Sequence, residues 1–248
     1  MENSGSLFFG SMAYNNLIPP TVYKCKDERG NEFWADKENA SIPGFLYFPD
    51  FVNEEEAEQI LQLIDSKKWN GGIGRRTQHY GYTYYHTKHD LIELQPEIQP
   101  EETESLSELK FFNDRILHFF PDDHPPTQCL VNEYVSNRGI SSHVDSPICF
   151  GDIVVGLSLC DPVYMTFQPI DDPTTDIKVF LASRSLMVMS NDVRFKWKHA
   201  ITAMKRVYVP DTGDCIHRRE NYRRVSLTYR EIKVEGTKQV SSNSTEFL

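Results

Sequence analysis

Two histidines and an aspartate stand in an order that could bind a metal ion. His143 and Asp145 are separated by one residue, and His199 follows within Trp197-Lys198-His199-Ala200. Two imidazoles and one carboxylate form the facial set that holds non-haem Fe(II) and leaves coordination positions open. A single histidine is more often a surface or packed core residue, so the triad gains weight only from the residues that accompany it.

Other residues could bind the co-substrate that such an iron needs. Oxygen activation requires two electrons beyond those of the substrate, and a 2-oxo acid that chelates the iron supplies them by decarboxylation. Its far carboxylate needs a cation, and Arg224 can bind it in bidentate fashion with help from Ser226 and Tyr134. Arg230 can lie nearer to the metal, and Asn132 can meet the chelating end. We therefore expect Fe(II), 2-oxoglutarate and O2.

The last apolar-polar run places several of these groups on one side of a strand. Residues 224–230 alternate, so that one face carries Arg224, Ser226, Thr228 and Arg230. An edge strand exposed to water would give the same pattern. A row of two arginines and two hydroxyls is also typical of an anion pocket.

Two helices precede a long stretch of short strands. The first helix should follow Asn53, which forms a capping box with Glu56, and the second should follow Ser105, with Glu108 three residues later. Apolar stripes indicate that both are packing helices. From residue 129 onward, β-rich runs are predicted at Cys129–Tyr134, Ile153–Leu159, Val163–Gln168, Ile177–Leu181, Leu186–Met189 and Arg224–Arg230.

This order predicts a mainly β fold of the α+β class, with a sandwich or jelly roll and helices on one side. Residues 43–235 should form one domain, with the jelly-roll core over about 129–232. Residues 1–42 lack a clean period and are expected to form an irregular arm, and residues 236–248 a frayed tail.

The composition excludes several classes. Apolar residues make up 39% of the chain, enough for a core, and no stretch has the length of a membrane span or a secretory signal, so we expect a cytoplasmic or nuclear protein without a membrane partner. The five cysteines are odd in number and widely spaced, which fits neither a disulfide framework nor a zinc ribbon.

The charge is unevenly distributed. A net charge of -10 would argue against a nucleic-acid partner. However, residues 90–123 carry ten acids against two bases, whereas residues 194–230 carry ten bases against three acids. The basic region coincides with the proposed site, and its Arg218, Arg219 and Arg223 are candidates for contact with a phosphate backbone.

The ordered motifs resemble the AlkB family of oxygenases. The matching pieces are Asn132-x-Tyr134, His143-x-Asp145, His199 and Arg224-x-Ser226-x-Thr228-x-Arg230, over about 100 residues. The resemblance implies a double-stranded β-helix core, Fe(II), 2-oxoglutarate, and hydroxylation of a modified base, with loss of formaldehyde where the carbon is an N-methyl group.

Departures from the family pattern bear on the substrate. Members that repair alkylated DNA carry an acidic residue just after the His-x-Asp pair, where this chain has Ser146-Pro147. Ser226 stands where repair enzymes usually have Asn. Both features, with residues 75–82 and 150–159, look more like the eukaryotic branch that modifies the wobble uridine of transfer RNA. RNA or single-stranded nucleic acid is therefore the expected partner.

A tyrosine-rich stretch, Arg75 to His89, could cover the substrate. It interleaves cations and aromatic rings, and the candidate contacts are Arg75, Arg76, His79, Tyr80 and Tyr82. A β-hairpin packing on the sheet explains the same alternation. Two other functions also remain open: the same oxygenase chemistry on a protein or lipid-like substrate, and a non-catalytic binding module.

Overall fold

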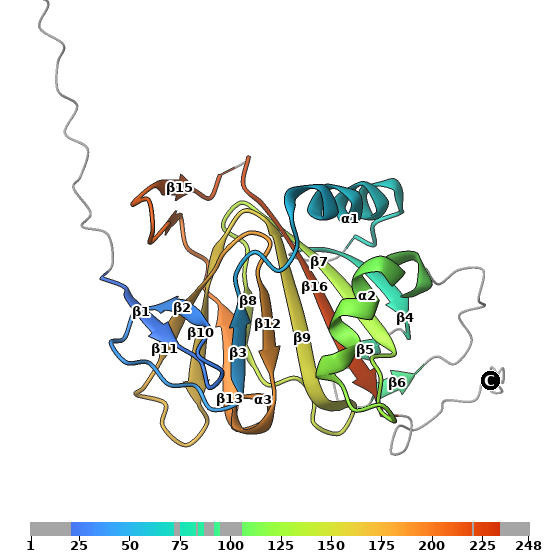
Figure 1. The fold of residues 1–248 in the computed structure, drawn as a ribbon. Coiled ribbons are helices and arrows are strands. Elements are labelled where there is room, and N and C mark those ends of the chain that lie inside the picture. Colours follow the sequence, from blue (N-terminus) through green and yellow to red (C-terminus); the bar gives the residue numbers. More distant parts are fainter. Residues whose placement is uncertain are drawn as a thin grey trace, which may run out of the picture.

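A computed structural model describes residues 21–71, 75–82, 84–86, 92–94, 106–219 and 221–233. Two six-stranded antiparallel sheets face each other (Figure 1). The major sheet has the order β3 (Phe45–Phe48), β12 (Leu186–Met189), β9 (Phe150–Cys160), β16 (Arg223–Ile232), β7 (Gln128–Val135) and β4 (Arg76–Gly81). The minor sheet has the order β1 (Tyr23–Lys26), β2 (Glu32–Ala35), β11 (Ile177–Leu181), β10 (Val163–Pro169), β13 (Trp197–Ile201) and β8 (Ile140–His143). The predicted jelly-roll core is confirmed.

Shorter elements complete the fold. Two small hairpins pair β5 (Tyr84–His86) with β6 (Ile92–Leu94), and β14 (Arg206–Tyr208) with β15 (Cys215–His217). The helices are α1 (Glu54–Ser66), α2 (Lys110–Ile116) and α3 (Asn191–Lys196), with 3-10 turns η1 (Leu106–Leu109) and η2 (Leu117–Phe119). In the described part of the chain, no helix has the length and apolar character needed to cross a membrane.

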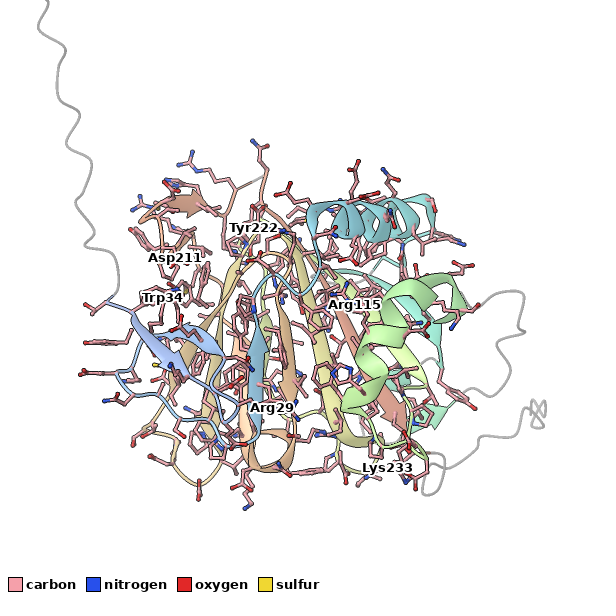
Figure 2. All side chains as sticks on the ribbon, in the orientation of Figure 1. Arg29, Trp34, Arg115, Asp211, Tyr222 and Lys233 are labelled. Carbon is pink, nitrogen blue, oxygen red and sulfur yellow. The ribbon has the colours of Figure 1, made fainter. Side chains whose placement is uncertain are left out.

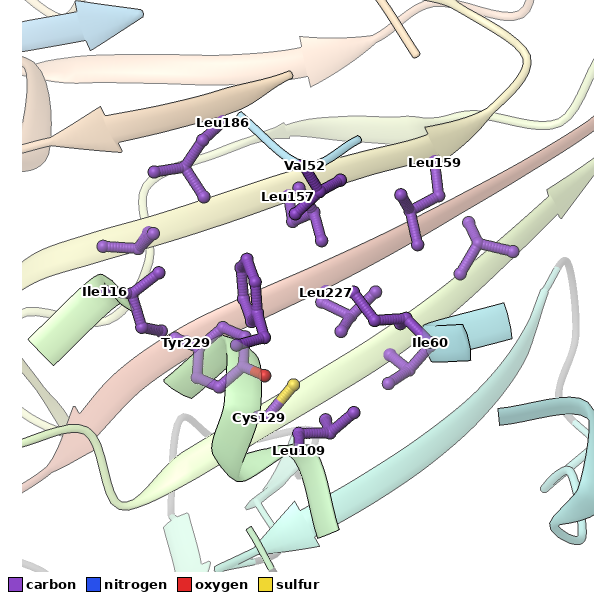
Figure 3. Packing of buried hydrophobic residues seen from close by; sticks show 14 of the residues in the cluster. Val52, Ile60, Leu109, Ile116, Cys129, Leu157, Leu159, Leu186, Leu227 and Tyr229 are labelled. Atoms are coloured by element: carbon purple, nitrogen blue, oxygen red, sulfur yellow. The ribbon is translucent and has the colours of Figure 1, made fainter. Parts of the chain in front are cut away.

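The first helix begins as predicted. The Asn53 side chain accepts a hydrogen bond from the Glu56 backbone N–H, and the Glu56 carboxylate accepts one from the Asn53 backbone. The apolar stripe of α1 buries Ile60 and Ile64 in the cluster on the outer face of the major sheet, and Ile60 lies near Leu227 (Figure 3). Burying each isoleucine contributes about 2 kcal/mol.

The second helix differs at its start. Leu106–Leu109 forms a 3-10 turn before α2, and the helix has no side-chain cap at Leu109. The expected cap residue, Ser105, lies outside the described residues. The predicted apolar face is correct, because Leu109, Phe112 and Ile116 are fully buried in the same cluster as α1. Both helices therefore cover one face of the major sheet and leave the other free to face the minor sheet (Figure 1).

The expectation of an irregular arm over residues 1–42 is wrong for its described part. Strands β1 and β2 form a hairpin, and β2 joins the minor sheet through Ala35 and Val179. The Asp27 carboxylate closes the turn by accepting hydrogen bonds from the backbone N–H groups of Arg29 and Asn31. Four-residue strands are too short to show a period in the sequence.

Strand β16 separates two chemically different environments. Its odd-numbered core residues, such as Leu227 and Tyr229, pack toward the helices, where Tyr229 meets Cys129 of β7. Its even-numbered residues face the space between the sheets, and cross-strand partners share their face. On that inner face Arg224 pairs with Tyr134, Ser226 with Asn132, and Arg230 with Gln128. The predicted polar face is therefore buried inside the molecule and is not an exposed edge.

Candidate active site

The predicted metal ligands lie together between the sheets. His143 ends β8 and is the direct cross-strand partner of His199 on β13, with ring centroids 4.3 Å apart. Asp145 follows β8 in the chain, and its Oδ2 lies 3.8 Å from His199 Nε2. One ligand atom from each of the three residues lies within 4.8 Å of the others. Two paired strands and one loop thus bring the facial donor set to one point.

Neighbouring groups orient two of the three ligands. His143 Nδ1 lies 2.8 Å from the Ser141 carbonyl oxygen. Donation to this carbonyl places the proton on Nδ1 and leaves the Nε2 lone pair for a metal. Arg230 Nη1 donates to Asp145 Oδ1 over 2.6 Å. One carboxylate oxygen is thereby occupied by the guanidinium, and the other remains available as a single ligand.

Burial and charge give Asp145 and His199 the protonation states that metal binding requires. Burial raises the pKa of Asp145, but the positive charge of Arg230, with smaller contributions from the histidines, lowers it to about 2. Burial lowers the pKa of His199 to about 4. At neutral pH the site therefore offers an ionised carboxylate and a neutral imidazole.

Arg224 is suited to the far carboxylate of 2-oxoglutarate. Its side chain is buried, and its Nε and Nη2 donate to Ser158 Oγ over 3.1 and 2.7 Å. Its Nη1 is buried without a hydrogen-bond partner in the described structure, and the guanidinium lies 5.4 Å from the Tyr134 ring. A buried, unsatisfied donor on a cation is costly and fits a carboxylate that binds there.

Arg230 lies at the other end of this inner face, and Asn132 lies between it and Arg224. Arg230 Nη2 donates to Gln128 Oε1 over 2.7 Å, while its Nε is buried without a partner among the described residues. Asn132 Oδ1 accepts a hydrogen bond of 2.7 Å from Arg75 Nε, which leaves the Asn132 amide N–H groups as donors. The residues present therefore fit both the metal and the dicarboxylate.

Arg194 supports the metal-ligand loop through backbone contacts. Its guanidinium is 2% exposed and donates to the carbonyl oxygens of Asp145, Ser146, Phe150 and Gly151, at 2.7, 3.4, 3.3 and 3.0 Å. These carbonyls span the loop that follows Asp145 and the start of β9. Because Arg194 belongs to α3, directly before β13, it ties the Asp145 loop to the strand that carries His199.

The sequence interpretation missed Ser158, Gln128 and Arg194. Ser158 is a buried polar residue in the apolar second half of β9, and that anomaly could have indicated a partner for a buried charge. Gln128 begins its strand as the cross-strand partner of Arg230, a pairing that only the register reveals. Arg194 binds backbone carbonyls, so no complementary side chain in the sequence could have signalled it.

The candidate substrate residues divide between two environments. Tyr80 is fully buried in the helix-side core, so the interpretation of Tyr80 as a substrate residue is wrong. Arg76 lies on the same side of the sheet, where it pairs with Glu133 and packs over Trp69, and its side chain is 52% exposed. The alternative, packing on the sheet, holds for these two positions. Arg75 and His79 lie on the inner face instead, where His79 Nδ1 is buried without a described partner.

Tyr82 follows β4 and is 44% exposed. The rest of the tyrosine-rich stretch is only partly described: β5 and β6 form a hairpin, and residues 87–91 lie outside the described residues. Arg75, His79 and Tyr82 therefore remain the candidates for substrate contact from this segment.

Two of the three arginines that were expected to contact phosphate already bind other groups of the protein. Arg218 is 3% exposed and donates to backbone carbonyls. Arg223 pairs with Glu133 on the sheet and with Asp65 of α1. Only Arg219 of this group is exposed.

Comparison with known proteins gives the family. The model of the 2OG-Fe(II) oxygenase superfamily matches residues 44–230. An Arabidopsis thaliana protein, "Alkylated DNA repair protein ALKBH8 homolog", is 31% identical over 218 residues, 78% of this chain and 59% of the relative. The Mus musculus "tRNA (carboxymethyluridine(34)-5-O)-methyltransferase ALKBH8" is 26% identical over 77% of this chain and 31% of the relative. The chain thus spans less than two thirds of the length of these relatives.

The fold is shared with a solved structure, that of OsALKBH1, at a TM-score of 0.52 and 18% identity, with 77% of this chain and 99% of that chain covered. The family model spans the His143-x-Asp145 pair, His199 and Arg230, the positions that the structure brings together between the two sheets. The chain therefore belongs to the 2OG-Fe(II) oxygenase superfamily, and the relatives that it resembles are named as ALKBH homologues.

Proposed function

We propose that the protein hydroxylates or oxidatively demethylates a modified base in nucleic acid, with RNA, and transfer RNA in particular, preferred over DNA. The site geometry carries the catalytic part of this proposal: the His-Asp-His cluster lies beside two buried arginines with unsatisfied donors. The names of the two relatives, one a DNA repair protein and one a transfer RNA methyltransferase, support a nucleic-acid substrate.

His143, Asp145 and His199 would hold Fe(II), and Arg224 would bind the far carboxylate of 2-oxoglutarate. When bound, these groups reduce O2 at the expense of decarboxylation, which yields succinate, CO2 and one oxygen atom inserted into a C–H bond of the substrate. If the carbon is an N-methyl group, the hydroxymethyl product breaks its C–N bond and releases formaldehyde.

The protein contributes orientation and charge. Arg230 binds one oxygen of Asp145, so the other oxygen would be the metal ligand. Ser158 binds Nε and Nη2 of Arg224, and Nη1 would be the donor for the co-substrate carboxylate. The Asn132 side-chain oxygen accepts a hydrogen bond from Arg75, so its N–H groups would be the donors for the metal-chelating end of 2-oxoglutarate. The base itself would enter unpaired or flipped out, because these ligands lie too deep between the sheets to reach a stacked base.

Preference for a base without an exocyclic amine rests on the loop after the metal ligand. Ser146 Oγ lies 2.8 Å from Cys149 Sγ, and Ile148 is 65% exposed beside it. This loop thus presents a small hydroxyl and an apolar side chain, with no carboxylate to accept a hydrogen bond from an exocyclic amine. Uracil and thymine, which have no exocyclic amine, fit this loop better than adenine or cytosine. The choice of uridine in RNA over thymidine in DNA is supported by the transfer RNA uridine that the name of the Mus musculus relative gives.

The test is turnover on two pools. The purified protein is incubated with Fe(II), 2-oxoglutarate and ascorbate on total transfer RNA and on methylated DNA oligonucleotides, and nucleosides are compared by mass spectrometry. We expect a product that gains oxygen or loses a methyl group in the transfer RNA pool, absent with His143→Ala and present with His118→Ala, a surface substitution of the same type. Turnover that survives His143→Ala would overturn the metal assignment. Consumption of 2-oxoglutarate without change in either pool would move the search to protein substrates.

A further inference from the structure

The β14–β15 hairpin has one apolar and one polar face. Val207 and Ile216 are cross-strand partners and pack with Tyr164 on the outer side of the minor sheet. Arg206 and His217 form the neighbouring cross-strand pair, so their side chains point to the opposite side. The hairpin is therefore anchored through its apolar face and presents a cationic face to solvent.

A buried arginine joins the base of this hairpin to two loops near the active site. The Arg218 guanidinium donates to the carbonyl oxygens of Ser136 at 3.1 Å, Thr202 at 3.3 Å, and Arg138. Its backbone N–H donates to the Lys205 carbonyl oxygen over 2.9 Å. One guanidinium thus fixes the β7–β8 loop, the β13–β14 loop and the hairpin base relative to one another.

The guanidinium is held firmly in place. It lies 4.5 Å from the centroid of the Tyr222 ring, and the Tyr222 hydroxyl donates to the Pro162 carbonyl oxygen over 3.0 Å. Figure 2 shows Tyr222 near the upper ends of the long strands, to the right of the hairpin, and its ring packs in one apolar cluster with Val207 of the hairpin. A buried arginine stacked on a fixed ring and bound to carbonyls is part of the framework, so the residues that it positions keep a defined arrangement.

This framework holds the backbone of Arg138 and Lys205 against Arg218, and Arg206 and Arg219 are their chain neighbours. We name these four basic residues the hairpin-base surface: Arg138, Lys205, Arg206 and Arg219. Three of them are exposed and Arg206 is half-buried, and in the described part of the chain none of the four has an ion-pair partner. The acids Asp211 and Asp214 lie in the hairpin turn, at the opposite end, where Trp34 Nε1 and Thr212 Oγ1 donate to them. On a chain with a net charge of -10, such a cluster is complementary to an anionic partner.

We propose that the hairpin-base surface docks the phosphate backbone of a single-stranded RNA segment whose modified base enters the active site. The proposal rests on the function proposed above. Strand β8 runs from Ile140, two residues after Arg138, to the metal ligand His143, so it covers about 10 Å at roughly 3.3 Å per residue. One strand of a nucleic-acid helix rises about 3.4 Å along its axis per nucleotide, and an extended single strand covers more, so about 10 Å corresponds to three nucleotides or fewer.

The test is binding of fluorescently labelled total transfer RNA, measured by anisotropy at several salt concentrations. For Lys205→Glu/Arg219→Glu we expect affinity to fall at least about tenfold at low salt, and the slope of log affinity against log salt to decrease by about two. Lys205→Ala/Arg219→Ala should lose about threefold, which guards against a folding defect in the charge reversal. The control Arg29→Glu/Lys37→Glu makes the same charge change, with Arg29 at the other end of the molecule (Figure 2), and should change affinity less than twofold.

Equal losses in the double variant and the control would show that only net charge matters, and would overturn the proposal. Binding to phosphatidylserine vesicles in place of transfer RNA would also overturn it. The two proposals fail separately. If Lys205→Glu/Arg219→Glu loses RNA affinity but the unaltered protein modifies no nucleoside, the surface stands and the proposed chemistry fails. If nucleosides are modified and the variant keeps its affinity, the chemistry stands and the surface fails.

Discussion

Arg223 and Arg224 are adjacent in the chain, and their guanidinium groups lie on opposite faces of the major sheet. Arg223 reaches the helix side, where it pairs with Glu133 at 2.8 Å and Asp65 at 2.5 Å. Arg224 reaches the space between the sheets, where it binds Ser158. The two residues are of the same type and belong to the same strand. Substitutions at the two positions can therefore distinguish a structural role from co-substrate binding.

Substitution of Arg224 should weaken binding of 2-oxoglutarate without unfolding the protein. Arg224→Lys keeps a charge but loses the planar fork, and we expect the dissociation constant for 2-oxoglutarate to rise about tenfold, a cost of about 1.4 kcal/mol. Isothermal titration with Mn(II) as an inert metal measures this directly. Arg223→Gln is the matched control and should leave the dissociation constant within twofold. Similar losses in both variants would contradict the assignment of Arg224.

Arg194→Met should weaken metal binding although Arg194 touches no ligand side chain. Methionine fills a similar volume but leaves four loop carbonyls without their donor, so the Asp145 loop loses its fixed position. Residues that orient metal ligands typically contribute ten- to a hundredfold in affinity, and we expect about tenfold. Mn(II) titration followed by electron paramagnetic resonance measures the free ion. Lys196→Met, on the exposed side of α3, should bind Mn(II) normally, and a normal value for Arg194→Met would refute the positioning role.

The candidate site could be predicted because the type of each side chain indicates its role, even though these residues are distant in the chain. His143, Asp145 and Arg224 were identified from the donor set that iron and a dicarboxylate need, and alternation assigned Arg224 to a polar face. What alternation could not give was the direction of that face. The strand lies third from one edge of a six-stranded sheet, between β9 and β7, and its neighbours follow from long-range pairing.

The tyrosine-rich stretch is a second case in which alternation does not show which residues face which side of the sheet. In β4 the residues alternate, and nothing in Arg76-Thr77-Gln78-His79-Tyr80 indicates which set faces the helices. The apolar stripe of α2 decides it, because Tyr80 joins the cluster that contains Phe112. The two polar residues on the helix side, Arg76 and Gln78, then find partners in Glu133 and in the Ile64 carbonyl at the end of α1.

Tyr80 and Tyr82 should respond differently to truncation. Tyr80→Ala removes a fully buried ring and should lower the free energy of unfolding by about 4 kcal/mol. Tyr82 is 44% exposed, so Tyr82→Ala should leave stability within about 0.5 kcal/mol. If Tyr82 stacks on a base, its removal weakens RNA binding by about tenfold, in the range of 1–3 kcal/mol for base-aromatic stacking. Urea unfolding and RNA anisotropy on the same preparations provide both readouts. A destabilised Tyr82→Ala or a stable Tyr80→Ala would contradict the assignment of the two faces.

Glu133 should make the stability of the protein sensitive to acid. Its side chain is 3% exposed. Burial raises the pKa of its carboxyl, but hydrogen bonds from Arg76 and Arg223 outweigh burial and hold the pKa below its usual value of 4.5. A carboxyl whose pKa is lower in the folded state binds fewer protons there than in the unfolded chain, so its contribution is complete above about pH 4.5 and is lost as the pH falls through the folded value.

Glu133→Gln therefore provides the comparison. At pH 7 the variant should unfold about 2 kcal/mol more easily than the unaltered protein, because two charge-assisted hydrogen bonds become neutral ones. This difference should stay constant down to about pH 4.5 and shrink below it, because the unaltered carboxylate is then protonated and resembles the amide. Urea unfolding at a series of pH values measures the difference, with Glu58→Gln on the exposed side of α1 as the control. A gap that persists or widens in acid would mean that the two arginines do not stabilise Glu133 through its charge.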